Sequence, residues 1–149
     1  MAIANSLDGA AKRLELRLQQ LASGMSGSVE VGFEKGATYD DGMPVAQVAF
    51  WNEYGTRKIP ARPFFRTMLA KQVNTLPKSL AKYLKETGFQ GEKTLNIIGQ
   101  KLQDELVVSI RNWTTPPNAP YTINKKGFNK PLVDTAHMMR SVSFKVSND

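Results

Sequence analysis

The chain contains no cysteine and only one histidine, His137, among its 149 residues. The lack of cysteine excludes disulfide bonds and thiolate metal sites, and a single imidazole leaves few ways to pair a nucleophile with a base. No apolar run approaches the roughly 18 residues that indicate a membrane span. Asp8, Glu15 and several basic residues interrupt the first 25 positions, where a secretory signal needs an apolar stretch, so we expect the chain to stay in a cytoplasm.

The composition is that of an ordinary folded protein. Hydrophobic residues make up 41% of the chain and charged residues 22%, and 149 residues suit one domain, which we place at residues 1–149. The formal charge is +7, from 20 Lys and Arg against 13 Asp and Glu. This excess favours acidic partners or nucleic acid without identifying either.

Helical and strand periodicities alternate along the chain. Apolar residues at three- and four-residue steps predict helices near residues 3–21, 63–85 and 95–113, with Pro77 expected to kink or divide the second. A shorter helix is expected from Pro44 to Tyr54, and another over residues 132–139. Two-residue alternation predicts strands at residues 29–33 and 142–146.

These elements predict a single α+β domain, with a small antiparallel β-sheet packed against two or three long α-helices. Residues 35–43 read as a polar connection. Residues 114–131 carry four prolines and Gly127, so we expect an irregular excursion there. Because two strands alone are marginal in water, we expect helices, residues 35–43 or another subunit to complete the sheet.

The stretch from Val48 to Arg66 joins aromatic residues, a forced turn and basic residues. Gly55 suits the positive φ that closes a helix, and each proline pushes its preceding residue toward an extended conformation. We therefore expect a helix end near Tyr54, a stiff loop, and a new helix near Pro63. The expected structural anchors are Trp51, Tyr54, Gly55, Pro60, Pro63, Phe64 and Phe65.

Basic residues concentrate just beyond this turn. Residues 57–85 contain eight Lys or Arg and no acidic residue, more than the whole net charge. A solvated helix face explains part of this pattern, and an acidic protein surface or nucleic acid are the functional alternatives. The residues that we expect to dock against a partner are Arg57, Lys58, Arg62, Arg66, Lys125 and Lys126.

Catalytic patterns are nearly absent. His137 follows Asp134 by three residues, which fits a surface or interface histidine held by a neighbour better than a hydrolase without a recognisable nucleophile. The acidic pairs at 40–41 and 104–105 are explained by turn formation and solvation. We therefore expect no enzyme activity, no catalytic residue, no cofactor and no metal.

Two motifs resemble the tail-completion or neck proteins of long-tailed bacteriophages. The first is Trp51-Asn52-Glu53-Tyr54-Gly55-Thr56 followed by Ile59-Pro60-Ala61-Arg62-Pro63-Phe64. The second is Lys130-Pro131-Leu132-Val133-Asp134-Thr135 with Met138 and Ser141-Val142. The order of elements resembles that family over nearly the whole chain. Family members usually carry Gly after the Asp-Thr pair, where this chain has Ala136, so we expect a continued helix in place of a left-handed turn.

The resemblance implies a structural virion protein that completes the tail and joins it to the head-side connector. It implies a homo-oligomeric ring, a hexamer, around the DNA channel, with tail-terminator, tail-tube or head-connector proteins as neighbours. It also implies contact with genomic DNA in the lumen, no membrane, and a location in the virion neck after assembly in the host cytoplasm. The alternative function is nucleic-acid binding through the basic surface between Arg57 and Lys85.

Overall fold

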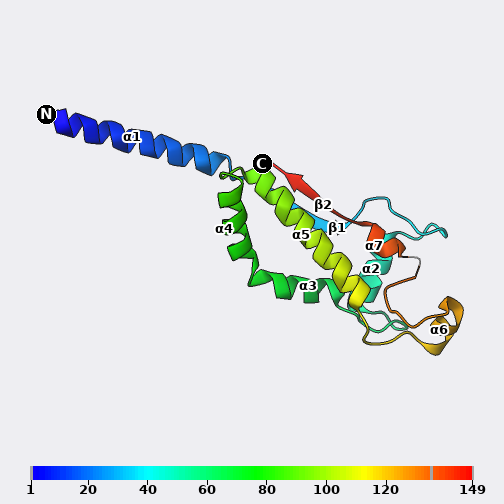
Figure 1. The fold of residues 1–149 in the computed structure, drawn as a ribbon. Helices are drawn as coiled ribbons and strands as arrows, with labels where there is room; N and C mark the ends of the chain where they lie inside the picture. The colour runs from blue at the N-terminus through cyan, green and yellow to red at the C-terminus, as the bar shows by residue number, and fades with distance from the viewer. Residues whose placement is uncertain (1, 135, 149) are drawn as a thin grey trace.

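We describe the chain in a computed structural model that covers residues 2–134 and 136–148, with the backbone alone for residues 2–8. The fold is the expected small α+β domain (Figure 1). In chain order the elements are α1 (Ala2–Ser23), β1 (Ser28–Phe33), α2 (Val45–Tyr54), α3 (Phe64–Val73), α4 (Leu76–Glu86), α5 (Gly91–Asn112), α6 (Pro120–Lys126), α7 (His137–Arg140) and β2 (Val142–Ser147).

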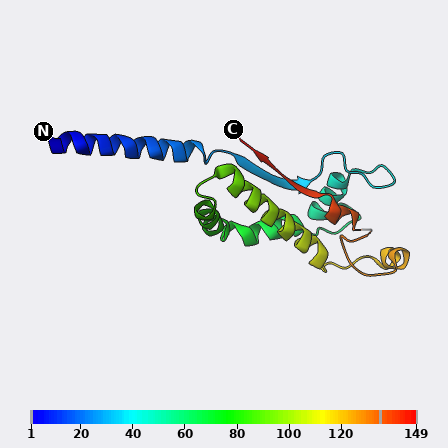
Figure 2. The same cartoon turned by 45° about the horizontal axis from the view of Figure 1, so that its top comes forward.

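The two predicted strands pair with each other in an antiparallel sheet. Ser28 lies opposite Ser147, and Phe33 lies opposite Val142. Helix α5 packs against both strands, and α3 and α4 pack on α5 (Figures 1 and 2). Gly99 permits the close approach of α5 to the sheet, because a side chain there would overlap the ring of Phe144. In the part of the chain that the structure describes, α5 is thus the long helix that covers the sheet, and α3 and α4 cover α5.

Helix α5 also supplies most of the core. The apolar stripe predicted for residues 95–113 is buried from Ile98 to Ile110, because this helix lies between the sheet and α3, and it is half-buried at its two ends, Leu95 and Trp113. Buried side chains from the other elements complete the cluster. Its members are Val45, Ala49, Phe64, Met68, Ile98, Leu102, Leu106, Ile110, Met138 and Val142.

The segment expected to be one helix with an internal proline is divided in two. Helix α3 ends at Val73 and α4 begins at Leu76, which places Pro77 in the first turn of α4. Proline is tolerated there because the first N–H groups of a helix have no partner inside it. The prediction that Pro77 divides the segment is confirmed.

Two local expectations were wrong. The helix expected over residues 132–139 is only α7, and Ala136, at φ 60°, takes the left-handed conformation just before it. The left-handed turn is therefore present although glycine is absent. The excursion at 114–131 is not wholly irregular, since α6 lies within it and ends at Gly127, at φ 79°. Residues 35–43 form a loop. Thr38 in this loop forms an isolated β-bridge with Pro44, outside the two strands of the sheet.

Candidate docking site

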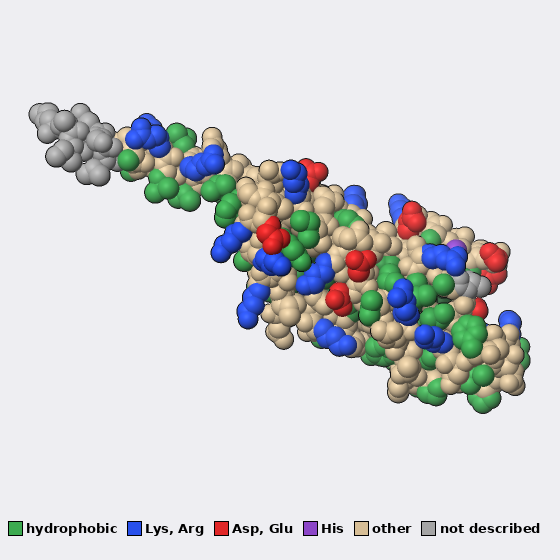
Figure 3. Space-filling model, in the orientation of Figure 1, with side chains coloured by type: hydrophobic (Ala, Val, Ile, Leu, Met, Phe, Trp, Pro, Cys, Tyr) green, Lys and Arg blue, Asp and Glu red, His purple; other side chains and the backbone are tan. Residues whose placement is uncertain are grey.

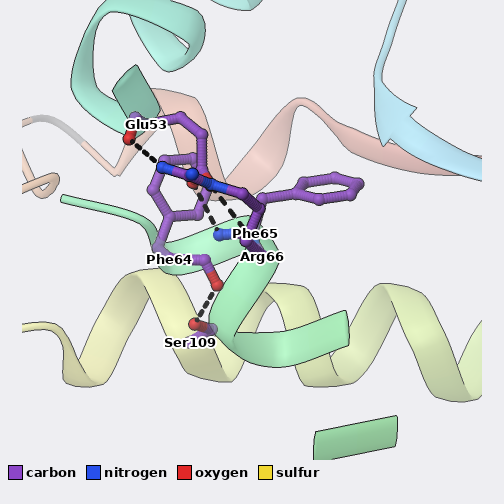
Figure 4. Close-up of polar contacts among 5 residues, drawn as sticks. All are labelled: Glu53, Phe64, Phe65, Arg66 and Ser109. Atoms are coloured by element: carbon purple, nitrogen blue, oxygen red, sulfur yellow. Dashed lines mark hydrogen bonds and ion pairs between the residues drawn. The ribbon is translucent and has the colours of Figure 1, made fainter. Parts of the chain in front are cut away.

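Glu53 connects the two helices of the aromatic turn. It lies in the last turn of α2 with only 5% of its surface exposed, and its carboxylate accepts hydrogen bonds from the backbone N–H groups of Phe65 and Arg66, at 2.9 and 3.2 Å (Figure 4). These N–H groups belong to the first turn of α3, which Pro63 precedes without a capping side chain. A carboxylate is favoured there because the first N–H groups of a helix are unpaired and partly positive. Glu53 thus caps α3 from another helix.

Arg66 completes this corner between α2 and α3. Its Nε donates to the Glu53 carboxylate at 2.8 Å, and its Nη2 donates to the Glu53 backbone carbonyl at 3.1 Å. The guanidinium also lies over the ring of Tyr54, 4.7 Å from the ring centre. On the opposite side of α3, the hydroxyl of Ser109 donates to the Phe64 carbonyl at 2.8 Å (Figure 4). The start of α3 is therefore fixed from both α2 and α5.

The expected aromatic anchors differ in how deeply they are buried. Phe64 is 1% exposed, whereas Trp51 and Phe65 are half-buried. Tyr54 is 56% exposed and stacks on Phe50, with 4.7 Å between the ring centres, so this expected structural anchor lies at the surface of the corner and not in the core. Its position at the end of α2 turns the ring outward, beside Arg66.

The loop after α2 is a compact turn. Gly55 has φ 77° and closes α2, and a side chain at this position would overlap Ala61 and the carbonyl of Ile59. The Thr56 hydroxyl accepts the backbone N–H groups of Lys58 and Ile59, at 3.1 and 3.0 Å. Arg57 and Lys58 are exposed in this turn, where a partner would reach them.

Arg62 has a structural position that the sequence did not indicate. It is 5% exposed, and its guanidinium donates to the carbonyls of Pro116 and Pro117 and to the side-chain oxygen of Asn52, at 3.0, 3.1 and 3.2 Å. Burial lowers the pKa of the Arg62 guanidinium. Arg62 therefore fastens the excursion to the aromatic turn, and we correct the expectation that it is a docking residue.

The two lysines of the excursion also differ. The ammonium of Lys126 donates to the backbone carbonyls of Lys130 and Val133 and lies 4.9 Å from the centre of the Phe128 ring. Burial lowers the pKa of Lys126, Asp134 raises it, and the charge of Arg62 lowers it further. Lys125 is exposed and remains available to a partner.

A cavity of about 390 Å³ lies between the aromatic turn and the second motif. Its lining includes Ile59, Pro60 and Arg62 of the first motif and Leu132, Val133 and Asp134 of the second. Lys58, Lys126, Asp41 and Tyr39 add polar groups of both signs. Burial raises the pKa of the Tyr39 hydroxyl, and Asp134 and Asp41 raise it further. The two sequence motifs, about seventy residues apart, are thus brought together at one place.

The predicted docking residues do not form one cluster. Lys58, Arg62 and Lys126 line this cavity, whereas Arg66 lines an apolar groove of about 240 Å³ with Phe33, Phe50 and Phe65. Figure 3 shows Lys and Arg side chains distributed over the visible face rather than gathered on one element. The remaining residues of the basic segment, Lys71, Lys78, Lys82 and Lys85, are exposed on α3 and α4, and Lys82 pairs with Glu86 at 3.8 Å.

Groups with catalytic or metal-binding potential are sparse. The ring of His137 lies 5.1 Å from that of Tyr39, and its Nε2 is buried without a hydrogen-bond partner among the described residues. Within residues 2–134 and 136–148, no three His, Asp or Glu side chains are placed to hold a metal ion. None of the described helices combines the length and apolarity of a membrane span.

Sequence reasoning missed Glu53 as a functional residue of the turn. The available signal was Pro63, which can start a helix but cannot cap it with its side chain, and which therefore leaves the first N–H groups of α3 open to an acceptor from another element. Comparisons of the chain with protein-family models, with curated proteins and with solved structures found no match.

Proposed function

We propose that this chain is a structural subunit of the neck of a tailed bacteriophage, which completes the tail and joins it to the head-side connector as a ring around the DNA channel. The observation that carries the proposal is the meeting of the two motifs that resemble the neck family. Ile59, Pro60 and Arg62 of the first motif line the same cavity as Leu132, Val133 and Asp134 of the second. Motifs that are distant in sequence and adjacent in space support one shared role.

Part of the apolar surface of the domain is exposed, where neighbouring subunits would cover it. Phe50 and Tyr54 are each 56% exposed beside the apolar groove at the corner of α2 and α3. The sheet has only two strands, β1 and β2, among the described residues. Exposed apolar patches and unpaired strand edges are typical of surfaces that another subunit covers. These features support a homo-oligomer, for which we propose a hexamer.

Arg57 and Lys58 are the residues that we propose for contact with a neighbouring ring or with DNA in the lumen. Both are exposed in a turn whose backbone is fixed by Thr56 and Gly55, so a partner would meet a preformed basic surface. Their proposed partners are acidic groups of tail-terminator, tail-tube or head-connector proteins. Lys125, exposed at the end of α6, is proposed as a further contact.

Complementation in a phage that encodes this chain tests the proposal. Disruption of the gene should yield DNA-filled heads and tails that accumulate unjoined, and the chain supplied in trans should restore infectious particles. The double variant Arg57→Glu, Lys58→Glu should fold but fail to restore joining. The charge-matched control is Lys35→Glu, Lys93→Glu, which changes exposed residues outside the turn. Normal joining without the gene would refute the neck role.

Nucleic-acid binding is the second candidate, because four lysines of α3 and α4 are exposed along one continuous segment of chain. A protein that binds phosphates loses affinity steeply as salt rises. Retention on double-stranded DNA at low salt, lost in the variant with Lys71, Lys78, Lys82 and Lys85 changed to Gln, would favour this function. Unchanged retention in that variant would exclude this surface.

A further inference from the structure

The two-stranded sheet has an open edge on each side. Helix α5 covers one face of the sheet, and α1 extends away from it (Figures 1 and 2). Among the described residues, no backbone hydrogen bond joins residues 28–32 or 143–147 to a segment outside the sheet. In each strand about half of the backbone N–H and C=O groups point away from the paired strand. Each edge therefore offers unpaired donors and acceptors to a further strand.

The two strands carry opposite charges on the face that α5 leaves uncovered. Glu30 of β1 lies opposite Lys145 of β2, and both side chains are exposed. Neither side chain belongs to an ion pair in the part of the chain that the structure describes. Their neighbours on the same face are small. They are Ser28, Gly32, Ser143 and Ser147. Glu30 and Lys145 are therefore the charges that this face presents to an added strand.

The edge of β2 also adjoins a partly apolar groove of about 690 Å³. Its lining includes Phe144 of β2, Tyr83 of α4 and Ile97 of α5, and Ile97 is 38% exposed. Phe144 lies on the face of the sheet that α5 covers, with its ring against Gly99. A strand added at this edge would place every second side chain on the face of Phe144. Those side chains need to be apolar.

The sequence of β1 meets both requirements of this edge. Its apolar residues alternate with polar or small ones. The apolar set is Val29, Val31 and Phe33. If β1 of a second copy lay beside β2 in the register that the two strands already use within one chain, Val31 would lie opposite Phe144 and Glu30 opposite Lys145. A slip of one residue would turn the apolar set to the polar face.

Pairing of two β2 strands is less favourable. On the exposed face, an antiparallel pair of β2 strands would place Lys145 opposite Ser143, Ser147 or another Lys145. Serine adds no ion pair, and like charges directly opposite each other are destabilising. The charge pattern therefore favours β1 as the strand that covers the edge of β2.

We propose that the open edge of β2 binds the open edge of β1 from a second copy of this chain, antiparallel and with Glu30 opposite Lys145. The pairing rests on the homo-oligomer of the proposed function and names its interface, but it does not depend on the neck role. Each copy offers one edge of each kind, so the contact is head-to-tail and can close as a ring.

The absence of cysteine permits a cross-linking test. Ser28 and Ser147 lie opposite each other in the proposed register. Opposed residues of antiparallel strands have Cα atoms about 4.5 to 5.5 Å apart, within the range of about 4.4 to 6.8 Å that a disulfide accepts. Because Ser28→Cys and Ser147→Cys are carried on separate chains, a disulfide between them must join two chains. The two variants, coexpressed and mildly oxidised, should give a dimer of doubled mass on a non-reducing gel, whereas neither variant should do so alone.

The matched control is coexpression of Ser28→Cys with Ser143→Cys, which lies on the same strand and face as Ser147 but out of register. This mixture should give little or no dimer. Equal cross-linking of the control would overturn the proposal. A dimer from Ser147→Cys alone would also overturn it, because that result requires β2 to pair with β2.

Charge reversal tests the same pairing without cysteine. Lys145→Glu should lower the assembled fraction in analytical ultracentrifugation, because it places carboxylates on neighbouring strands, and addition of Glu30→Lys should restore that fraction. Lys93→Glu, exposed on α5, is the control and should change nothing. Near-ultraviolet circular dichroism checks that each variant is folded. An unchanged assembled fraction in Lys145→Glu would overturn the proposal.

The outcomes also separate this interface from the proposed function. A multimer that gives no disulfide in the mixture of Ser28→Cys and Ser147→Cys would overturn the strand pairing and leave the homo-oligomer in place. A single chain at every protein concentration would overturn both. The neck role is decided separately, by whether heads and tails join in the complementation experiment.

Discussion

The corner of α2 and α3 and the free helix α1 have similar apolar spacing but opposite surroundings. At the corner, Phe64 is 1% exposed and the start of α3 is tied to Glu53 and Ser109. In α1, Leu14 and Leu18 follow a helical period just as regular, yet both are more than half exposed. Periodicity therefore predicts that a helix forms and which face is apolar. It does not say whether that face is covered by the same chain or by another one.

The largest expected difference between the two regions comes from deleting a side chain in each. Phe64→Ala removes a fully buried ring from the core and should lower the free energy of unfolding by about 3 to 5 kcal/mol. Leu16→Ala, on the exposed outer side of α1, should change it by no more than about 0.5 kcal/mol. Urea denaturation followed by tryptophan fluorescence measures both. Similar losses would mean that α1 is part of the folded core.

The variant Phe65→Ala compares a half-buried ring with the fully buried ring of Phe64. The sequence predicted both Phe64 and Phe65 as anchors, but the structure leaves Phe65 half-buried beside the apolar groove and buries Phe64 fully. Adjacent residues of a helix point about 100° apart, so the choice between them depends on where α5 lies. The loss on Phe65→Ala should be clearly smaller than that on Phe64→Ala in the same denaturation experiment.

A smaller loss is expected when the cap of α3 is weakened. Glu53→Gln removes the charge that pairs with Arg66 and faces the N–H groups of Phe65 and Arg66, which should cost about 2 to 3 kcal/mol. Glu86→Gln is the control, because its exposed pair with Lys82 contributes only about 0 to 1 kcal/mol. Thermal unfolding of both variants checks the contrast. Equal effects would show that Glu53 does not hold the corner.

Removing Arg62 tests how the excursion is tied to the corner. Arg62→Met leaves the carbonyls of Pro116 and Pro117 without their donor, but it also removes a buried charge, so the net loss should be about 1 to 2 kcal/mol. Limited trypsin digestion should then cut faster after Lys125, while Arg57→Met, the exposed control, leaves that rate unchanged. An unaltered cutting rate in Arg62→Met would mean that other contacts hold the excursion.

These contrasts show what the sequence could predict. Local signals sufficed for the two strands, the break before Pro77 and the stop at Gly55, because each depends on residues within one or two turns. The cap by Glu53 and the tie by Arg62 depend on partners 12 to 55 positions away in the sequence, which only the packing of α2, α3 and the excursion brings near. From the sequence alone Arg62 was therefore predicted to be an exposed docking residue, although the structure buries its side chain.

The smallest expected effect concerns backbone preference just before α7, compared with that within α1. Ala136 is held at φ 60° before α7, a conformation that costs an alanine about 1 to 2 kcal/mol and a glycine little. Ala136→Gly should therefore stabilise the protein, by up to about 1 kcal/mol after the greater freedom of glycine in the unfolded chain is counted. A gain in stability is expected if the packing of the surrounding residues, and not the conformational preference of alanine, holds the backbone of Ala136 in the left-handed conformation.

The reverse substitution in α1 completes the comparison. Gly9 lies within the helix, and a Cβ added there would meet no atom within 4 Å, so Gly9→Ala should raise the helical circular dichroism of α1 and leave the melting of the body unchanged. Differential scanning calorimetry of Ala136→Gly should show a melting temperature higher by about 2 to 4 °C. A lower melting temperature would mean that the Ala136 methyl group contributes more through its contacts than the left-handed backbone costs. In that case Ala136 would contribute through its methyl group to how the two motifs pack together.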